Sequence, residues 1–119
     1  MNNKSVLIVD KSTFVRIMIS TLLKNVGCMV IGTADNVEDA INKYMDYEPD
    51  ITFIDIDLNG FDGIDLTRRI KKINPFAIVI VFVPKSEDTS ELVVESIRAG
   101  ATGYINKPIS KKSIQNQIN

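Results

Sequence analysis

Histidine and tryptophan are absent from this chain of 119 residues, and cysteine occurs once, as Cys28. A lone cysteine cannot form a disulfide within the chain, and without histidine the sequence cannot build a zinc site from cysteine and histidine. The lack of histidine also removes the commonest general base and every Ser/His or Cys/His nucleophile pair. Any chemistry must therefore use carboxylates, lysines and backbone groups.

The chain also lacks an excess of either charge. Fourteen Lys and Arg residues oppose fifteen Asp and Glu residues, which gives a net charge of −1. This balance disfavours nucleic acid and anionic membranes as partners, because both select basic surfaces. No apolar run is long enough for a signal peptide or a transmembrane helix. We therefore expect a cytoplasmic protein that binds neither nucleic acid nor membrane.

With 45% hydrophobic and 24% charged residues, the composition fits one globular domain over residues 1–119. Short β-branched runs predict five strands, at residues 6–9, 29–31, 51–54, 78–83 and 103–105. The first, third and fourth runs are apolar almost throughout, as expected for parallel strands that are covered on both faces.

Helical patterns lie between these runs. The expected helices begin at Ser12 or Thr13, at Asn36, near residue 64, at Asp88 or Thr89, and at Ser110. Gly27 and Gly100 are expected to stop the first and fourth, and Pro49 limits the second. The alternation predicts an α/β fold of the flavodoxin-like type, a doubly wound (βα)5 domain with a five-stranded parallel sheet in the order 2-1-3-4-5.

In such sheets ligands bind beyond the carboxyl ends of the strands, so the polar residues just after each strand are the candidate site. Singly, each would be an ordinary solvated loop residue, but together they converge on one edge of the sheet. These candidates are Asp10, Lys11, Asp55, Asp57, Lys85, Ser86 and Lys107.

Three segments carry a resemblance to a known family: residues 6–10 (VLIVD), 49–63 (PDITFIDIDLNGFDG) and 99–108 (AGATGYINKP). Together they resemble the receiver domain of two-component response regulators, of the chemotaxis-regulator type, over essentially the whole chain. The resemblance implies a phosphoprotein that takes a phosphoryl group from a sensor histidine kinase, from a phosphotransfer protein of a phosphorelay, or from a small phosphodonor. It implies no enzyme in the usual sense, but a domain that catalyses its own phosphorylation and dephosphorylation.

The resemblance also implies roles for particular residues. Asp55 corresponds to the phosphoacceptor, and Lys107, followed by a cis proline bond in the family, to the lysine that contacts the phosphoryl oxygens. Asp10, Asp55 and the backbone carbonyl of Asp57 correspond to ligands of Mg²⁺. A hydroxyl after the fourth strand and the aromatic Tyr104 correspond to a switch, which changes how the face of helix 4, strand 5 and helix 5 binds a downstream protein.

The sequence departs from this pattern at Lys11, where the family has a second acidic residue and metal ligand. Asp10, Asp55, Lys11 and Lys107 sum to zero charge, which lowers the need for Mg²⁺. An ammonium about 4 Å from a carboxylate is worth roughly 4 kcal/mol at an effective dielectric near 20. The hypothesis is therefore a Lys11–Asp55 ion pair that takes the place of the metal.

The sequence departs again after the fourth strand. The family's spacing places Lys85 at the switch hydroxyl, and Ser86 fits only if the loop is shifted by one residue. Asn59 stands where the family usually has proline.

Two alternatives remain at this point. One is a degenerate receiver that acts as a protein-interaction module without phosphorylation, with Lys11 replacing the metal. The other takes Asp55 and Asp57 as the paired aspartates of a dehalogenase-type phosphatase, a class of enzyme that needs a larger α/β body.

Overall fold

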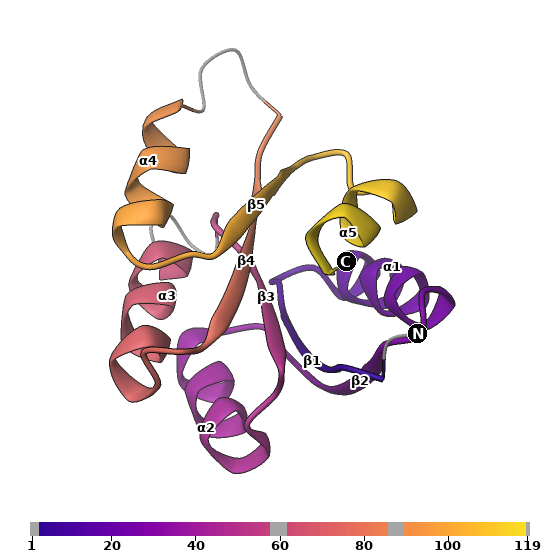
Figure 1. Cartoon of the computed structure of the whole chain (residues 1–119), viewed down its shortest axis with the longest axis horizontal. Coiled ribbons are helices and arrows are strands. Elements are labelled where there is room, and N and C mark those ends of the chain that lie inside the picture. Colours follow the sequence, from indigo (N-terminus) through magenta and orange to yellow (C-terminus); the bar gives the residue numbers. More distant parts are fainter. Residues whose placement is uncertain (1–2, 58–61, 86–89, 119) are drawn as a thin grey trace.

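The computed structural model describes residues 3–57, 62–85 and 90–118. In this part of the chain strands and helices alternate, as Figure 1 shows. The elements are β1 (Ser5–Val9), α1 (Thr13–Asn25), β2 (Met29–Ala34), α2 (Val37–Tyr47), β3 (Ile51–Asp55), α3 (Asp62–Ile73), β4 (Ile78–Val83), α4 (Ser90–Arg98), β5 (Gly103–Asn106) and α5 (Lys111–Ile118).

The five strands form one parallel sheet in the order β2-β1-β3-β4-β5. The predicted flavodoxin-like topology is therefore confirmed. From β1 the chain adds β2 on one side, which forms an edge of the sheet, and then returns past β1 to add β3, β4 and β5 on its other side. The carboxyl ends of β1 and β3, which are hydrogen-bonded neighbours, meet at the point where the direction of building reverses.

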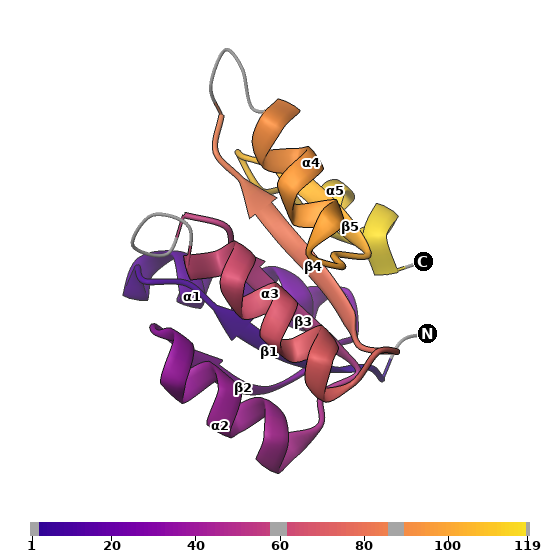
Figure 2. The same ribbon diagram turned by 90° about the vertical axis from the view of Figure 1, so that its left-hand side faces the viewer.

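Helices cover both faces of this sheet. In Figure 1, α1 and α5 lie on one side and α2, α3 and α4 on the other, and Figure 2 gives the same molecule after a quarter turn. Successive side chains of β3 serve the two faces in turn: Phe53 belongs to the core beneath α1 and α5, and Ile54 to the core beneath α2 and α3. This explains why most side chains of the strand are apolar.

The local signals at the ends of the first two helices act as expected. The Ser12 hydroxyl accepts a hydrogen bond from the Val15 N–H at the start of α1, and the Asn36 side chain accepts one from the Asp39 N–H at the start of α2. Gly27 follows α1 with a φ of 90°. Ser12 and Asn36 therefore set where α1 and α2 begin, and Gly27 follows the end of α1.

The structure differs from one expectation about element ends and leaves another outside the described residues. β2 runs to Ala34, beyond the predicted residues 29–31, because its second half pairs with β1. This pairing outweighs the weak strand preference of Gly32 and Thr33. The predicted start of the fourth helix, Asp88 or Thr89, lies outside the described residues, as do Asn59 and Ser86.

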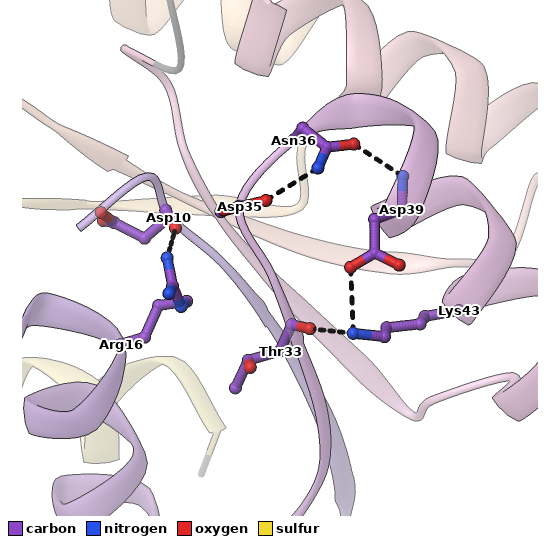
Figure 3. Close-up of polar contacts among 7 residues, drawn as sticks. All are labelled: Asp10, Arg16, Thr33, Asp35, Asn36, Asp39 and Lys43. Atoms are coloured by element: carbon purple, nitrogen blue, oxygen red, sulfur yellow. Dashed lines mark hydrogen bonds and ion pairs between the residues drawn. The ribbon is translucent and has the colours of Figure 1, made fainter. Parts of the chain in front are cut away.

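The two edge strands, β2 and β5, have side chains bonded to their backbone. The ammonium of Lys43 on α2 donates to the carbonyl of Thr33 in β2, and also pairs with Asp39 (Figure 3). On the opposite edge, the Gln117 amide on α5 donates to the carbonyl of Tyr104 in β5 at 3.0 Å. Each helix thus covers part of the outer edge of its strand.

None of the helices in the described ranges is both long and apolar enough to cross a membrane.

Candidate functional site

The candidate site lies at the carboxyl ends of β1, β3 and β5. Two aspartates and one lysine come together there: Asp10 directly after β1, Asp55 as the last residue of β3, and Lys107 directly after β5. Both aspartates are almost fully buried, with exposed fractions of 1% for Asp10 and 3% for Asp55. Buried carboxylates are costly unless they are paired, so their partners define the chemistry of the site.

Asp55 has a partner for each carboxylate oxygen. Its Oδ1 accepts the backbone N–H of Asp57 at 3.1 Å, and its Oδ2 accepts the ammonium of Lys107 at 3.1 Å. Lys107 is held in reach because its own N–H donates to the carbonyl of Val83 on the neighbouring β4. The Lys107–Pro108 peptide bond is cis, as the resemblance implied.

Asp10 is compensated less well. Its Oδ1 accepts the backbone N–H of Ser12 at 2.9 Å, whereas its Oδ2 is buried with no hydrogen-bond partner in the described part of the chain. The pKa of Asp10 is raised from 3.8 to about 6, chiefly by burial; the negative charge of Asp55 contributes to the rise, while the Ser12 N–H and the charge of Lys107 oppose it. The site therefore has one carboxylate oxygen that a cation would satisfy.

The expected Lys11–Asp55 ion pair is wrong. Lys11 is exposed and makes no ion pair or hydrogen bond with any described residue, and the cation on Asp55 is Lys107. The physical reason is the turn after β1, in which the Asp10 carboxylate accepts the Ser12 N–H and Ser12 caps α1. This turn leaves the side chain between them in solvent, where the ammonium keeps its hydration.

The two described switch candidates, Lys85 and Tyr104, have no ion pair or side-chain hydrogen bond to Asp10, Asp55 or Lys107. Lys85 follows β4 and is exposed, with no ion pair to any described side chain, and Ser86 lies outside the described residues. Tyr104 is on β5 and is 39% exposed. Their switch roles stay predictions.

Asp57 contributes its backbone N–H to Asp55, while its own side chain is exposed. An acid placed in this way does not form a buried carboxylate pair with Asp55. The structure therefore adds no support to the dehalogenase-type interpretation, which rests on the spacing of Asp55 and Asp57 alone.

Sequence reasoning missed two residues that shape the site. A Cβ at Gly63, in the first turn of α3, would lie 2.4 Å from the carbonyl oxygen of Asp55 and 2.6 Å from Cα of Ile56. Only glycine lets α3 pack this close to the end of β3. The second is Arg16 on α1, whose guanidinium reaches the backbone carbonyl of Asp10 (Figure 3).

The glycine had a sequence signal, because it closes the quoted segment 49–63. The arginine had none, since a single basic residue in a helix is ordinary.

The residues present fit Mg²⁺ as an oxygen-liganded cation. No three Asp, Glu, Cys or His residues in ranges 3–57, 62–85 and 90–118 form a metal-binding group by themselves. Two carboxylates from Asp10 and Asp55, with a backbone carbonyl such as that of Asp57, are nevertheless the ligand type that Mg²⁺ prefers. The unpartnered Oδ2 of Asp10 is the observation in favour of this fit.

Comparison with known proteins identifies relatives over nearly the whole chain. The model of the response regulator receiver domain family matches residues 6–119. The chemotaxis protein CheY of Thermotoga maritima is 36% identical over 116 residues, which cover 98% of this chain and 95% of that protein. CheY of Bacillus subtilis is 33% identical over 114 residues, which cover 96% of this chain and 93% of that protein.

Solved structures agree with these relatives. The crystal structure of a CheX–CheY–BeF3–Mg complex from Borrelia burgdorferi contains a chain that matches with a TM-score of 0.86 and 29% identity, covering 97% of this chain and 86% of that one. The receiver domain of NtrX from Brucella abortus matches with a TM-score of 0.82 and 30% identity, covering 93% of this chain and 92% of that domain.

Proposed function

Because the chain belongs to the family of response regulator receiver domains, the phosphoacceptor modules of two-component signal transduction, we propose that Asp55 is the residue that accepts the phosphoryl group. The observation that carries this proposal is the pairing of a nearly buried Asp55 with the ammonium of Lys107 at 3.1 Å. A carboxylate that attacks a phosphoryl group needs nearby positive charge, because both reactants are negative.

The reaction forms one bond and breaks one. A carboxylate oxygen of Asp55 attacks phosphorus and forms an acyl phosphate. The bond from phosphorus to the donor breaks, and its electron pair leaves with the imidazole nitrogen of a phosphohistidine or the acetate oxygen of acetyl phosphate. Lys107 holds one Asp55 oxygen and supplies charge for the phosphoryl oxygens, and the Asp57 N–H holds the other.

Mg²⁺ is the cofactor that this donor set supports. When bound, it neutralises charge on the phosphoryl group and on the carboxylates. Asp10, Asp55 and the backbone carbonyl of Asp57 would hold it. Asp10 has the free buried oxygen for this role.

Lys11 lowers the affinity for Mg²⁺ because it puts a positive charge next to Asp10 where the family has an acidic residue, but it does not replace the ion, because its side chain lies in solvent. The substitution Lys11→Asp should therefore strengthen Mg²⁺ binding by roughly tenfold, because it reverses a charge next to Asp10, as measured by titration calorimetry. Lys85→Asp, a matched change at another exposed lysine after a strand, should have a smaller effect. Equal affinity in the wild-type protein and Lys11→Asp would contradict the role given to Lys11.

The domain acts on itself and is not an enzyme for a separate substrate. Its donor is a sensor histidine kinase or a phosphotransfer protein. Its output is a downstream protein that binds the face formed by α4, β5 and α5. Exposed apolar side chains on α4 and β5 support this assignment, with exposed fractions of 45% for Val94, 53% for Ile97 and 39% for Tyr104.

Intact-mass measurement after treatment with acetyl phosphate and Mg²⁺ tests the acceptor. The wild-type protein should gain one phosphoryl group, and Asp55→Asn should gain none. Asp57→Asn is the matched control, because it removes an exposed carboxylate two residues away and should leave labelling intact. Labelling of Asp55→Asn, or no labelling of the wild-type protein, would overturn the proposal.

A further inference from the structure

Arg16 connects α1 to the turn that carries Asp10. Its Nη1 donates to the backbone carbonyl of Asp10 at 2.6 Å, and its Nη2 donates to the hydroxyl of Thr13 at 3.0 Å. Figure 3 shows the side chain extended from the helix toward the end of β1. The guanidinium is a planar fork, so two bonds fix both its position and its direction.

The Asp10 residue is thereby held at three points. Its N–H donates to the carbonyl of Ala34 in β2 at 3.0 Å, its carbonyl accepts Arg16, and its Oδ1 accepts the Ser12 N–H at 2.9 Å. With backbone and one carboxylate oxygen fixed, the remaining oxygen, Oδ2, has little freedom. It is also the buried oxygen that has no partner among the described residues.

Arg16 donates to the backbone carbonyl of Asp10 and not to its carboxylate, and this choice of acceptor affects the charge of the site. Arg16 bonds to the carbonyl oxygen of Asp10, and no ion pair joins its guanidinium to the Asp10 carboxylate. A salt bridge to the carboxylate would satisfy its charge and compete with a bound cation. A bond to the carbonyl orients the carboxylate and leaves its negative charge available.

We propose that Arg16 is a positioning residue, which fixes the Asp10 peptide so that the free carboxylate oxygen is set in place for a divalent cation shared with Asp55. This inference rests on the proposed function, because it gives Arg16 its role through the Mg²⁺ site. Residues that orient metal ligands without touching the metal commonly change metal affinity by 10–100-fold when they are replaced.

A purely structural role for Arg16 makes a different prediction. If the arginine only ties α1 to the β1 turn, its removal lowers the free energy of unfolding and leaves the Mg²⁺ affinity of the folded protein unchanged. Stability and Mg²⁺ affinity must therefore be measured on the same variants.

The experiment measures Mg²⁺ binding by titration calorimetry on the whole chain, and the rate of labelling by acetyl phosphate as Mg²⁺ is increased. Arg16→Met should weaken Mg²⁺ binding by about tenfold. Its labelling rate at saturating Mg²⁺ should return to within about threefold of the wild-type rate, because only the placement of Asp10 is affected. Arg16→Lys should recover part of the affinity, since lysine can donate one bond to the carbonyl but lacks the fork.

Lys24→Met is the matched control, because it removes one positive charge from the same helix at an exposed position. It should leave Mg²⁺ affinity within about twofold of the wild-type value. Thr13→Val removes only the second anchor of the guanidinium, and should give an affinity between those of the wild-type protein and Arg16→Met. If Arg16→Met fails to fold, the Mg²⁺ affinities of Thr13→Val and Arg16→Lys still test the proposal.

The outcomes separate the two proposals. Normal Mg²⁺ affinity in the Arg16 and Thr13 variants, alongside a wild-type protein that binds Mg²⁺ and is labelled, would overturn the role of Arg16 alone. A wild-type protein that neither binds Mg²⁺ nor accepts a phosphoryl group would overturn the proposed function and this inference with it.

Discussion

Two aspartates end neighbouring strands of the same sheet and are buried to nearly the same extent, yet their surroundings differ. Asp55 on β3 has a hydrogen-bond donor for each oxygen, one of them a lysine. Asp10 after β1 has one donor, a buried free oxygen and a raised pKa. The two carboxylates are therefore not equivalent, and the uncompensated charge of the site is located at Asp10.

Asp55 and Asp10 differ because a lysine ammonium pairs with Asp55 but, among the described residues, none pairs with Asp10. Lys107 comes from β5, far along the sequence, and is brought to Asp55 by the pairing of the chain with β4. Lys11 is next to Asp10 in sequence, but the turn between β1 and α1 directs it away. Sheet topology, more than proximity in sequence, decides which charge is neutralised.

The largest expected effect disturbs the backbone around Asp55. Gly63→Ala places a methyl group 2.4 Å from the Asp55 carbonyl oxygen, so α3 must move away from the end of β3. We expect a loss of about 2–3 kcal/mol in the free energy of unfolding, as for other overpacked sites, and slower labelling of Asp55. Urea denaturation and intact-mass kinetics measure the two effects.

Gly32→Ala is the matched control. A Cβ at Gly32 would lie 3.3 Å from the ring of Tyr47, which is half exposed and can shift. We expect a change of less than about 1 kcal/mol for this variant. Equal losses in the two variants would show that close approach to the Asp55 peptide is not what requires glycine at position 63.

The second effect acts on Asp10 and has the opposite sign. Because burial raises the pKa of Asp10 to about 6, the folded protein holds this proton more tightly than the unfolded chain. The contribution of Asp10 to stability is therefore full below its ordinary pKa of 3.8 and is lost as the pH rises through about 6.

Asp10→Asn removes the buried negative charge that lowers stability above pH 6. It should therefore raise the free energy of unfolding by about 2 kcal/mol at pH 7 without Mg²⁺. Unfolding curves of the wild-type protein and the variant between pH 4 and pH 8 measure the difference, which should grow with pH over the titration of Asp10. Added Mg²⁺ should stabilise only the wild-type protein. A variant that is less stable at every pH would show that the charge of Asp10 is already satisfied.

The smallest expected effect concerns Thr52, whose buried oxygen, like that of Asp10, has no partner among the described residues but lies outside the proposed Mg²⁺ site. Thr52 in β3 is fully buried, and its hydroxyl has no hydrogen-bond partner among the described residues. Thr52→Val keeps the shape and removes the unsatisfied group, so it should raise stability by about 1 kcal/mol. Labelling of Asp55 and Mg²⁺ affinity should not change.

Thr67→Val is the comparison for this variant, because the buried Thr67 hydroxyl does donate, to the carbonyl of Gly63 at 2.8 Å. Its loss should lower stability by about 1 kcal/mol. If both threonine variants moved stability in the same direction, the hydrogen-bond status of the hydroxyl would not be the deciding factor.

Much of the fold could be predicted from the sequence because three of its strands, β1, β3 and β4, are largely apolar on both faces and its first two helices carry clear caps. Ser12, Asn36 and Gly27 each mark an element end where expected. The length of β2 could not be predicted, since Gly32 and Thr33 become strand only by pairing with β1.

The site was predictable to the level of which residues follow each strand. Asp10, Asp55 and Lys107 come together because parallel strands end at one edge of the sheet. The direction of Lys11 was not predictable, because it depends on a turn closed by a side-chain bond. Neither was the role of Arg16, because a bond from a side chain to a carbonyl leaves no pattern in sequence.

The contacts of Lys43 and Gln117 with the two outermost strands have a consequence for how this domain behaves at high concentration. An open strand is a template on which another polypeptide can add by main-chain bonding, which leads to exchange of segments or to fibrils. Here an outward carbonyl on each flank is already occupied by an amine or an amide. A signalling module built in this way can be abundant and meet its partners through its helices, while unwanted growth of the sheet from either side is discouraged.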